Sequence, residues 1–123
     1  MIGYITLGTN DLPRAAAFYD ALLGSIGARR VMEYETFVLW GNGAGKAGLG
    51  VIKPYDKKAA TYGNGTMVAL AADSTAQVDA LYKKALELGA TCEGPAGQRA
   101  PGFYAAYFRD LDGNKLNVFY TGS

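Results

Sequence analysis

Histidine is absent from all 123 residues of the sequence, and this absence excludes several kinds of catalytic site. Serine and cysteine nucleophiles that need a histidine base cannot form. Sites for zinc, iron and nickel lose their commonest protein ligand. A site made of carboxylate and carbonyl oxygens would favour calcium or magnesium instead. The composition therefore argues against transition-metal and histidine-based chemistry.

Cysteine is nearly as scarce, because Cys92 is the single one in the sequence. One cysteine forms neither an intrachain disulfide nor a cysteine-based zinc site. It follows a predicted helix in a strand-like stretch, so we expect a buried or half-buried structural thiol.

The sequence also lacks long apolar runs and concentrated charge. No apolar run reaches the length that spans a membrane, and residues 1–4 lack the basic start of a signal peptide. The net charge is +1, and the basic residues are scattered rather than gathered in a stripe with aromatic residues. We therefore expect a cytoplasmic protein that binds neither membranes nor nucleic acid.

What the sequence does contain is an order of strands and helices that occurs twice. Runs rich in strand-forming residues alternate with two segments whose apolar residues recur at helical spacing. One helix is predicted after Asn10-Asp11, with Pro13 in its first turn, and a second begins with a capping box at Ser74. Strands are predicted at about residues 2–8, 29–34, 35–41, 47–53, 66–72, 90–95, 103–109 and 115–120.

This repeated order predicts an α+β fold of two βαβββ modules within one domain, residues 1–123. The modules cover about residues 1–56 and 64–123, with a linker at about 57–63. Asp11 and Ser74 occupy equivalent N-cap positions in the two halves. Two curved half-sheets brought together in this way predict a ligand cleft between them.

Two short motifs have a simpler structural interpretation. Residues 43–48 match the spacing G-x-G-x-x-G, but a predicted strand follows them where a dinucleotide site needs a helix. Asp110, Asp112 and Asn114 alternate like the start of a calcium loop, but the distal glutamate is missing. A flexible loop and a hairpin turn are the interpretations that we adopt.

Three segments together resemble a known superfamily. They are residues 4–19 (YITLGTNDLPRAAAFY), 63–70 (GNGTMVAL) and 103–117 (FYAAYFRDLDGNKLN). In combination they are similar to the vicinal oxygen chelate superfamily of glyoxalases, bleomycin-resistance proteins and extradiol dioxygenases. The resemblance implies paired βαβββ modules that form an incomplete barrel around a central cleft, often within a homodimer.

The resemblance also shows where metal-using members carry their ligands. The matching positions hold Tyr4, Met67 and Asn117 in place of two histidines and a glutamate, and residues 46–55 contain no acid. A phenol, a thioether and an amide are too poor a set for a transition metal. We therefore predict no metal and no other cofactor.

The same positions predict where a ligand binds. Strand alternation places Tyr4, Met67 and Asn117 on the floor of the cleft, with neighbours on the same faces. The predicted cleft residues are Tyr4, Thr6, Trp40, Met67, Ala69, Tyr107, Asn117 and Phe119.

Three functions are compatible with this pattern. The first is metal-free binding of a small, apolar or partly aromatic molecule. The second is a lyase, isomerase or dioxygenase of the glyoxalase type acting on a small carbonyl or aromatic substrate, with Tyr4 as general acid and Asn117 orienting a carbonyl. The third is a structural dimerising module whose cleft is filled by side chains.

Overall fold

The computed structural model describes residues 1–122. The chain divides into two compact units, Met1–Tyr62 and Gly63–Ser123, and each is described by itself.

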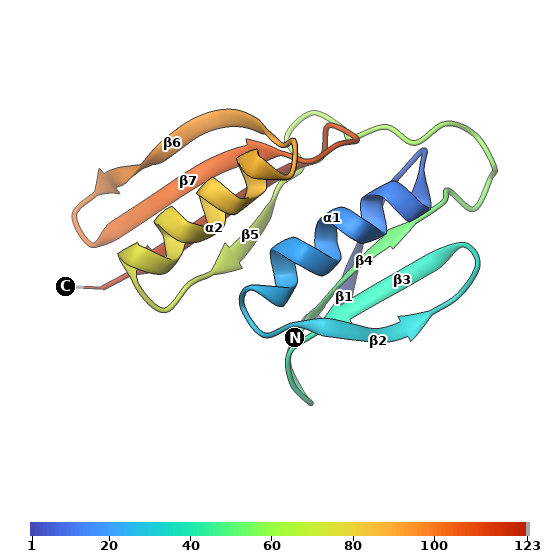
Figure 1. The fold of residues 1–123 in the computed structure, drawn as a ribbon, viewed down its shortest axis with the longest axis horizontal. Helices are drawn as coiled ribbons and strands as arrows, with labels where there is room; N and C mark the ends of the chain where they lie inside the picture. Colours follow the sequence, from blue (N-terminus) through green and yellow to red (C-terminus); the bar gives the residue numbers. More distant parts are fainter. Residues whose placement is uncertain (123) are drawn as a thin grey trace. The chain divides into compact units, whose positions relative to one another are not determined.

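The first unit is a four-stranded sheet with a helix on one face (Figure 1). Its strands lie in the order β1-β4-β3-β2, with β1 parallel to β4 and the other pairs antiparallel. The elements are β1 (Tyr4–Gly8), α1 (Leu12–Gly24), β2 (Arg29–Glu33), β3 (Phe37–Gly41) and β4 (Gly48–Ile52).

The second unit repeats this topology with the strand order β5-β8-β7-β6. Here β5 is parallel to β8, and β6, β7 and β8 are antiparallel. The elements are β5 (Val68–Ala71), α2 (Thr75–Glu87), β6 (Thr91–Ala100), β7 (Phe103–Arg109) and β8 (Lys115–Thr121). The predicted α+β fold with two βαβββ modules is confirmed.

Two strands differ from their predicted extents. β6 continues to Ala100, well past the predicted end near residue 95, and its pairing with β7 shifts at three places. It is an edge strand, which tolerates Pro95 because its missing N–H breaks no ladder within the sheet. β5 is shorter than predicted and begins at Val68, so Met67 precedes the strand.

Both helices begin at the predicted caps. Asp11 Oδ1 accepts a hydrogen bond from the Arg14 amide at 3.1 Å, and Ser74 Oγ accepts one from the Gln77 amide at 3.1 Å. The second cap differs in one detail, because the Gln77 side chain accepts from the amide of Asp73 rather than that of Ser74. Each cap satisfies an amide that the helix itself leaves unpaired.

The core of the first unit lies between the sheet and α1. Side chains on one face of the sheet pack against α1, which contacts β2, β3 and β4. Trp40 on β3 meets Tyr19 on α1 with ring centroids 5.7 Å apart. The other buried residues of this layer are Leu7, Leu12, Ala15, Phe18, Leu22, Leu23, Val38, Leu49 and Val51.

The second unit is built in the same way around α2, which contacts β6, β7 and β8. Tyr104 on β7 points towards the helix, because its hydroxyl donates to Asp79 of α2 at 2.5 Å. Alternation then places Ala106, Phe108, Leu116 and Val118 on the same face, where all are buried against Val78, Leu81 and Ala85.

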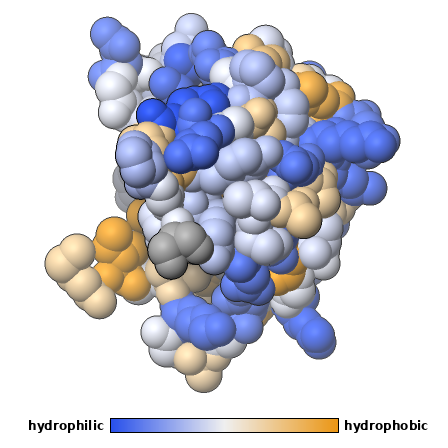
Figure 2. Space-filling model, turned by 90° about the vertical axis from the view of Figure 1, so that its left-hand side faces the viewer, coloured by the Kyte–Doolittle hydropathy of each residue, from blue (hydrophilic) through white to orange (hydrophobic). Residues whose placement is uncertain are grey.

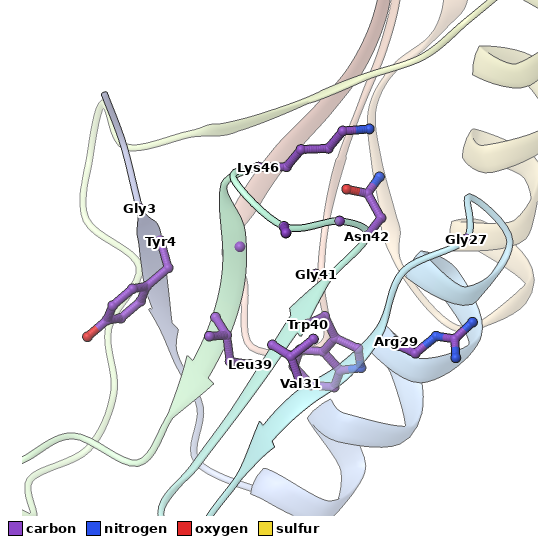
Figure 3. A pocket seen from close by; sticks show the side chains of 13 residues that line it. Gly3, Tyr4, Gly27, Arg29, Val31, Leu39, Trp40, Gly41, Asn42 and Lys46 are labelled. Atoms are coloured by element: carbon purple, nitrogen blue, oxygen red, sulfur yellow. The ribbon is translucent and has the colours of Figure 1, made fainter.

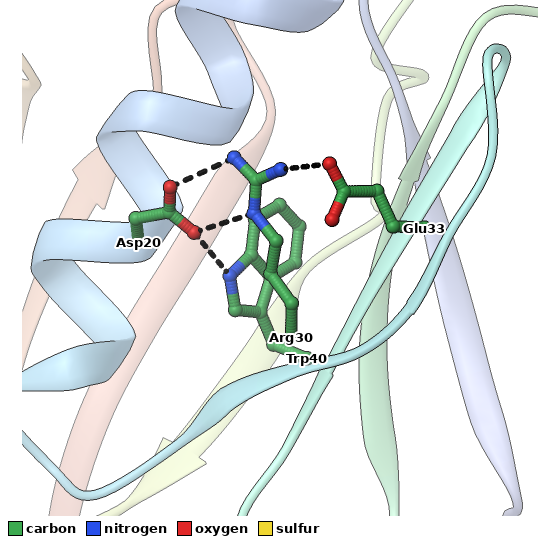
Figure 4. Close-up of polar contacts among 4 residues, drawn as sticks. All are labelled: Asp20, Arg30, Glu33 and Trp40. Carbon is green, nitrogen blue, oxygen red and sulfur yellow. Dashed lines mark hydrogen bonds and ion pairs between the residues drawn. The ribbon is translucent and has the colours of Figure 1, made fainter.

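A polar cluster ties α1 to its sheet (Figure 4). The carboxylate of Asp20 accepts two hydrogen bonds from the Arg30 guanidinium, at 2.9 and 2.8 Å, and a third from Trp40 Nε1 at 2.9 Å. Arg30 also donates to Glu33 at 2.8 Å and lies 5.9 Å from the centroid of the Trp40 ring. One carboxylate therefore joins the helix to two strands and satisfies the buried indole N–H.

Cys92 differs from its prediction, because it is exposed rather than buried. Its sulfur accepts a hydrogen bond from the Tyr82 hydroxyl at 3.0 Å, and this bond is the main cause of the raised pKa of Tyr82.

Hydrophilic side chains cover most of the face drawn in Figure 2, and hydrophobic ones form small separate groups there. Within residues 1–122, no helix combines the length and apolarity that crossing a bilayer requires.

Replacing Asp20 tests the polar cluster. We expect Asp20→Ala to lower the free energy of unfolding by about 1–3 kcal/mol, because the buried indole N–H of Trp40 loses its acceptor. Asp20→Asn keeps an oxygen for Trp40 and loses the partly exposed ion pair, so its cost is about 0.2–1 kcal/mol. Urea unfolding at neutral pH measures both, and equal losses would contradict the role of the indole bond.

The cluster also predicts a pH dependence. The hydrogen bond from Arg30 holds the pKa of Asp20 below its ordinary value, although desolvation opposes it. A carboxylate with a lowered folded-state pKa stabilises the fold above its ordinary pKa, and this effect is lost as the pH falls through the lowered value. The difference in stability between wild type and Asp20→Asn should therefore be present at neutral pH and vanish in strongly acidic buffer. A difference that does not change with pH would contradict this assignment.

Candidate functional site

Each sheet has a second face that its own helix does not cover, and we call it the helix-free face. Alternate residues of every strand point to it, because successive side chains in a strand point to opposite sides. Most of the predicted site residues belong to these two faces.

The helix-free face of the first sheet carries Tyr4 and Thr6. Tyr4 pairs with Gly48, and Thr6 pairs with Gly50, which in turn pairs with Leu39. Tyr4 is 58% exposed, and its ring centroid lies 6.1 Å from that of Phe37.

Glycine at position 50 allows this aromatic contact. A Cβ atom placed there would lie 2.5 Å from Cε1 of Phe37, closer than a carbon contact allows. The ring of Phe37 therefore lies over the β4 backbone, where it meets the ring of Tyr4.

Trp40 does not share this face. It lies on the opposite side of β3, 1% exposed, with its indole bonded to Asp20. Leu39 takes its place on the side of Tyr4 and Thr6. The sequence could not show whether Leu39 or Trp40 faces the helix, because β3 is apolar on both faces. Val38, Leu39 and Trp40 are all buried.

The second sheet brings three predicted residues together on its helix-free face. Ala69 on β5 pairs with Asn117 on β8, and Asn117 pairs with Tyr107 on β7, so the three form one row across the sheet. Phe119 lies two residues further along β8, on the same face, and stacks on Phe103 with centroids 5.9 Å apart. Met67 is 42% exposed, and it precedes β5 and is not part of the row.

Asn117 is the unusual member of the row. It is 2% exposed, and its Nδ2 has no hydrogen-bond partner within the described part of the chain. The nearby Asn114 is equally buried, but its Nδ2 donates to Asp110 Oδ2 at 3.0 Å. An unpaired buried amide costs about 1–3 kcal/mol, so its presence needs a reason.

Asn114 belongs to the hairpin turn that the sequence predicted. Asp110 Oδ1 accepts from the amides of Asp112 and Asn114, each at 2.9 Å, so the carboxylate organises the turn. Gly113 has φ 87°, a left-handed conformation suited to glycine.

Two basic residues that the sequence analysis missed flank Tyr107. The Arg99 guanidinium lies 5.5 Å from the ring centroid, and the Lys115 ammonium lies 5.6 Å from it. Alternation could have found Lys115, which lies two residues before Asn117 on β8. It could not have found Arg99, because the shifts in β6 break the period of two.

The side chains at the positions that the resemblance assigns to metal ligands are poor ligands for a metal. Tyr4, Met67 and Asn117 offer a phenol, a thioether and an amide. Within residues 1–122, no group of three or more histidine, cysteine, aspartate or glutamate side chains is placed to hold a metal ion.

The first unit also contains two open cavities. One, of about 550 Å³, lies at the end of the sheet near the β3–β4 loop (Figure 3). Lys46 and Asn42 extend from that loop, and Leu39, Val31 and Trp40 lie on the neighbouring strands. The other, of about 650 Å³, is lined by Thr9, Asn10, Thr36, Ile52, Lys53, Pro54, Tyr55, Lys57, Lys58 and Ala59. Neither contains Asn117 or its row.

Comparison with known proteins agrees with this architecture. A glyoxalase/bleomycin resistance protein from Albidiferax ferrireducens T118 is 35% identical with a TM-score of 0.91, covering 99% of each chain. A lactoylglutathione lyase from Agrobacterium tumefaciens is 22% identical with a TM-score of 0.73, covering 97% of this chain and 92% of its own. TioX from Micromonospora sp. ML1 is 17% identical with a TM-score of 0.73, covering 99% of each chain. The last two are similar in fold alone.

No curated protein matches the sequence. The family model described as Glyoxalase/Bleomycin resistance protein/Dioxygenase superfamily matches residues 1–118, nearly the whole chain. The family resemblance noted in the sequence is thereby confirmed, and the chain belongs to the glyoxalase/bleomycin resistance protein/dioxygenase superfamily.

Proposed function

We propose that this protein binds a small organic molecule without a metal, and that Asn117 on the helix-free face of the second sheet contacts the ligand. The observation that carries the proposal is the buried Nδ2 of Asn117, which has no partner within residues 1–122. A ligand oxygen that accepts from this amide would recover the free energy lost by its burial.

The neighbours of Asn117 favour a ligand with a flat apolar part. Phe119 and Phe103 are stacked on the same face, and aromatic side chains offer large contact surfaces. Ala69 beside Asn117 is small and exposed, which leaves space above this end of the row. A carbonyl or carboxylate attached to an aromatic or apolar body fits this combination of groups.

Binding is favoured over catalysis because of the chemistry of the residues. The helix-free faces carry aromatic, amide and basic side chains, with no histidine in the chain to act as a base near neutral pH. Tyr4 as a general acid stays a prediction, as does Thr6 as a ligand contact on the first sheet. Turnover of a bound carbonyl compound that Tyr4→Phe abolishes would favour the enzyme instead.

The predicted homodimer and the predicted cytoplasmic location are part of the same proposal. Members of the superfamily are often dimeric, and light scattering of the purified protein should then give twice the 13.0 kDa mass of one chain.

The cost of the unpaired amide can be measured. We expect Asn117→Leu to raise the free energy of unfolding by about 1 kcal/mol, because an apolar group of similar shape replaces an unsatisfied donor. Asn114→Leu is the matched control, and it should lower stability by about 1–3 kcal/mol because Asp110 loses a bonded partner. Urea unfolding compares the two variants with wild type. If both substitutions destabilise the protein equally, Asn117 is not an unsatisfied donor.

Ligand binding itself is tested by thermal denaturation in the presence of aromatic and apolar compounds that carry a carbonyl or carboxylate oxygen. A compound at a hundred times its Kd should stabilise the fold by about 2.7 kcal/mol. Asn117→Leu should reduce that shift, since the contact to the ligand oxygen is lost. Nickel, zinc and manganese salts should produce no shift. Stoichiometric metal in the purified protein, or a stabilising effect of these salts alone, would overturn the metal-free assignment.

A further inference from the structure

Arg99 lies on the helix-free face of the second sheet, exposed and bonded to its own strand. Its Nη2 donates to the carbonyl of Pro95 at 2.5 Å, and its guanidinium lies against the ring of Tyr107. The guanidinium therefore lies over its own strand and beside Tyr107, where it is open to solvent and to a ligand.

Two glycines of β6 make room for this guanidinium. A Cβ atom at Gly94 would lie 3.2 Å from Nη2 of Arg99, and one at Gly97 would lie 3.1 Å from Nη1. Both distances are shorter than ordinary contacts, so a larger residue at either position would push the guanidinium away. The pairing shifts of β6 occur next to these glycines, between Cys92 and Gly94 and between Gly94 and Gly97.

Lys115 supplies a second positive charge on the other side of Tyr107. It projects from β8 on the same face as Asn117, and its ammonium lies 5.6 Å from the Tyr107 centroid. The order across the face is thus Lys115 and Asn117 on β8, Tyr107 on β7 and Arg99 on β6.

The charges on this face do not cancel. Within residues 1–122, the ion pairs involve neither Arg99 nor Lys115. Glu93 on β6 is bonded to Arg109, and its charge also acts on Lys115, whereas Arg99 faces no such acid among the described ion pairs. A cluster of one guanidinium, one ammonium and one unpaired amide offers donors that match the oxygens of an anion.

We propose that the molecule bound on this face is an organic anion, a carboxylate attached to an aromatic or apolar body, with its charged group held by Arg99 and Lys115 beside Tyr107. This inference rests on the proposed function and adds the charge of the ligand to it. The planar guanidinium suits a carboxylate because two parallel N–H groups match its two oxygens. The apolar body lies over Phe119 and Phe103, and a further oxygen accepts from Asn117.

Naphthoate and naphthamide are the probes that test the charge. They share one aromatic body and differ in whether the attached group is a carboxylate or a neutral amide. We expect isothermal titration to show naphthoate binding at least about tenfold more tightly than naphthamide, with affinity falling as salt is added. Naphthyl phosphate in a parallel titration shows whether the two cations prefer a carboxylate to a phosphate.

Two variants locate the contact. Arg99→Gln and Lys115→Gln should each weaken naphthoate binding, by about tenfold to a hundredfold for Arg99→Gln, and leave naphthamide binding unchanged. Arg29→Gln and Lys83→Gln are matched controls: Arg29 belongs to the first sheet and Lys83 to the outer surface of α2. Both should bind naphthoate as wild type does. Circular dichroism and the melting temperature confirm that each variant is folded.

The outcomes separate the two proposals. Equal binding of both probes, or full affinity in Arg99→Gln, overturns the anion inference and leaves the proposed small-molecule function standing. Tighter phosphate binding would show that the anion is a phosphate ester and would overturn the carboxylate assignment. If neither probe nor any compound of the wider panel binds, and Asn117→Leu does not stabilise the protein, both proposals fail.

Discussion

The structure depends on one constraint: each four-stranded sheet has its own helix on one face and not on the other. Because strand side chains alternate, this constraint commits every second residue to the core and the residues between them to the other face. Val118 and Leu116 face the helix for this reason, and Asn117 between them, although also buried, faces the other side. The candidate site is therefore a consequence of how the core is built.

Much of the fold was predictable because local signals agreed with one another. Asp11 with Pro13, and Ser74 with Gln77, mark the helix starts through hydrogen bonds within a few residues, which a sequence displays directly. β6 was not predictable to the same extent, because its course depends on pairing shifts opposite β7. Those shifts are set by non-local contacts, and nothing in the order of residues 91–100 shows them.

The same distinction explains which predicted site residues share a face. Ala69, Tyr107 and Asn117 lie on regularly paired strands, so alternation was sufficient to place them on one side of the sheet, and their contact with a ligand stays a prediction. Trp40 lies on the opposite side of its sheet from Tyr4, although both line the cavity of about 550 Å³. An apolar strand does not show which of its faces meets the helix, and the bond of Trp40 to Asp20 does. Arg99 was missed because its position depends on contacts with Pro95, Gly94 and Gly97. The irregular pairing of β6 with β7 brings these residues next to its guanidinium.

The missing histidines bear on the second sheet in particular. Histidine is the side chain whose charge changes most readily near neutral pH, and none occurs in the sequence. The groups around Tyr107 are an amide, a guanidinium and an ammonium. Such groups donate hydrogen bonds to oxygen atoms, and the guanidinium and ammonium attract negative charge. The carboxylate proposed for this face supplies the acceptors and the negative charge together, so the same residues that motivate the binding proposal also motivate an anionic ligand.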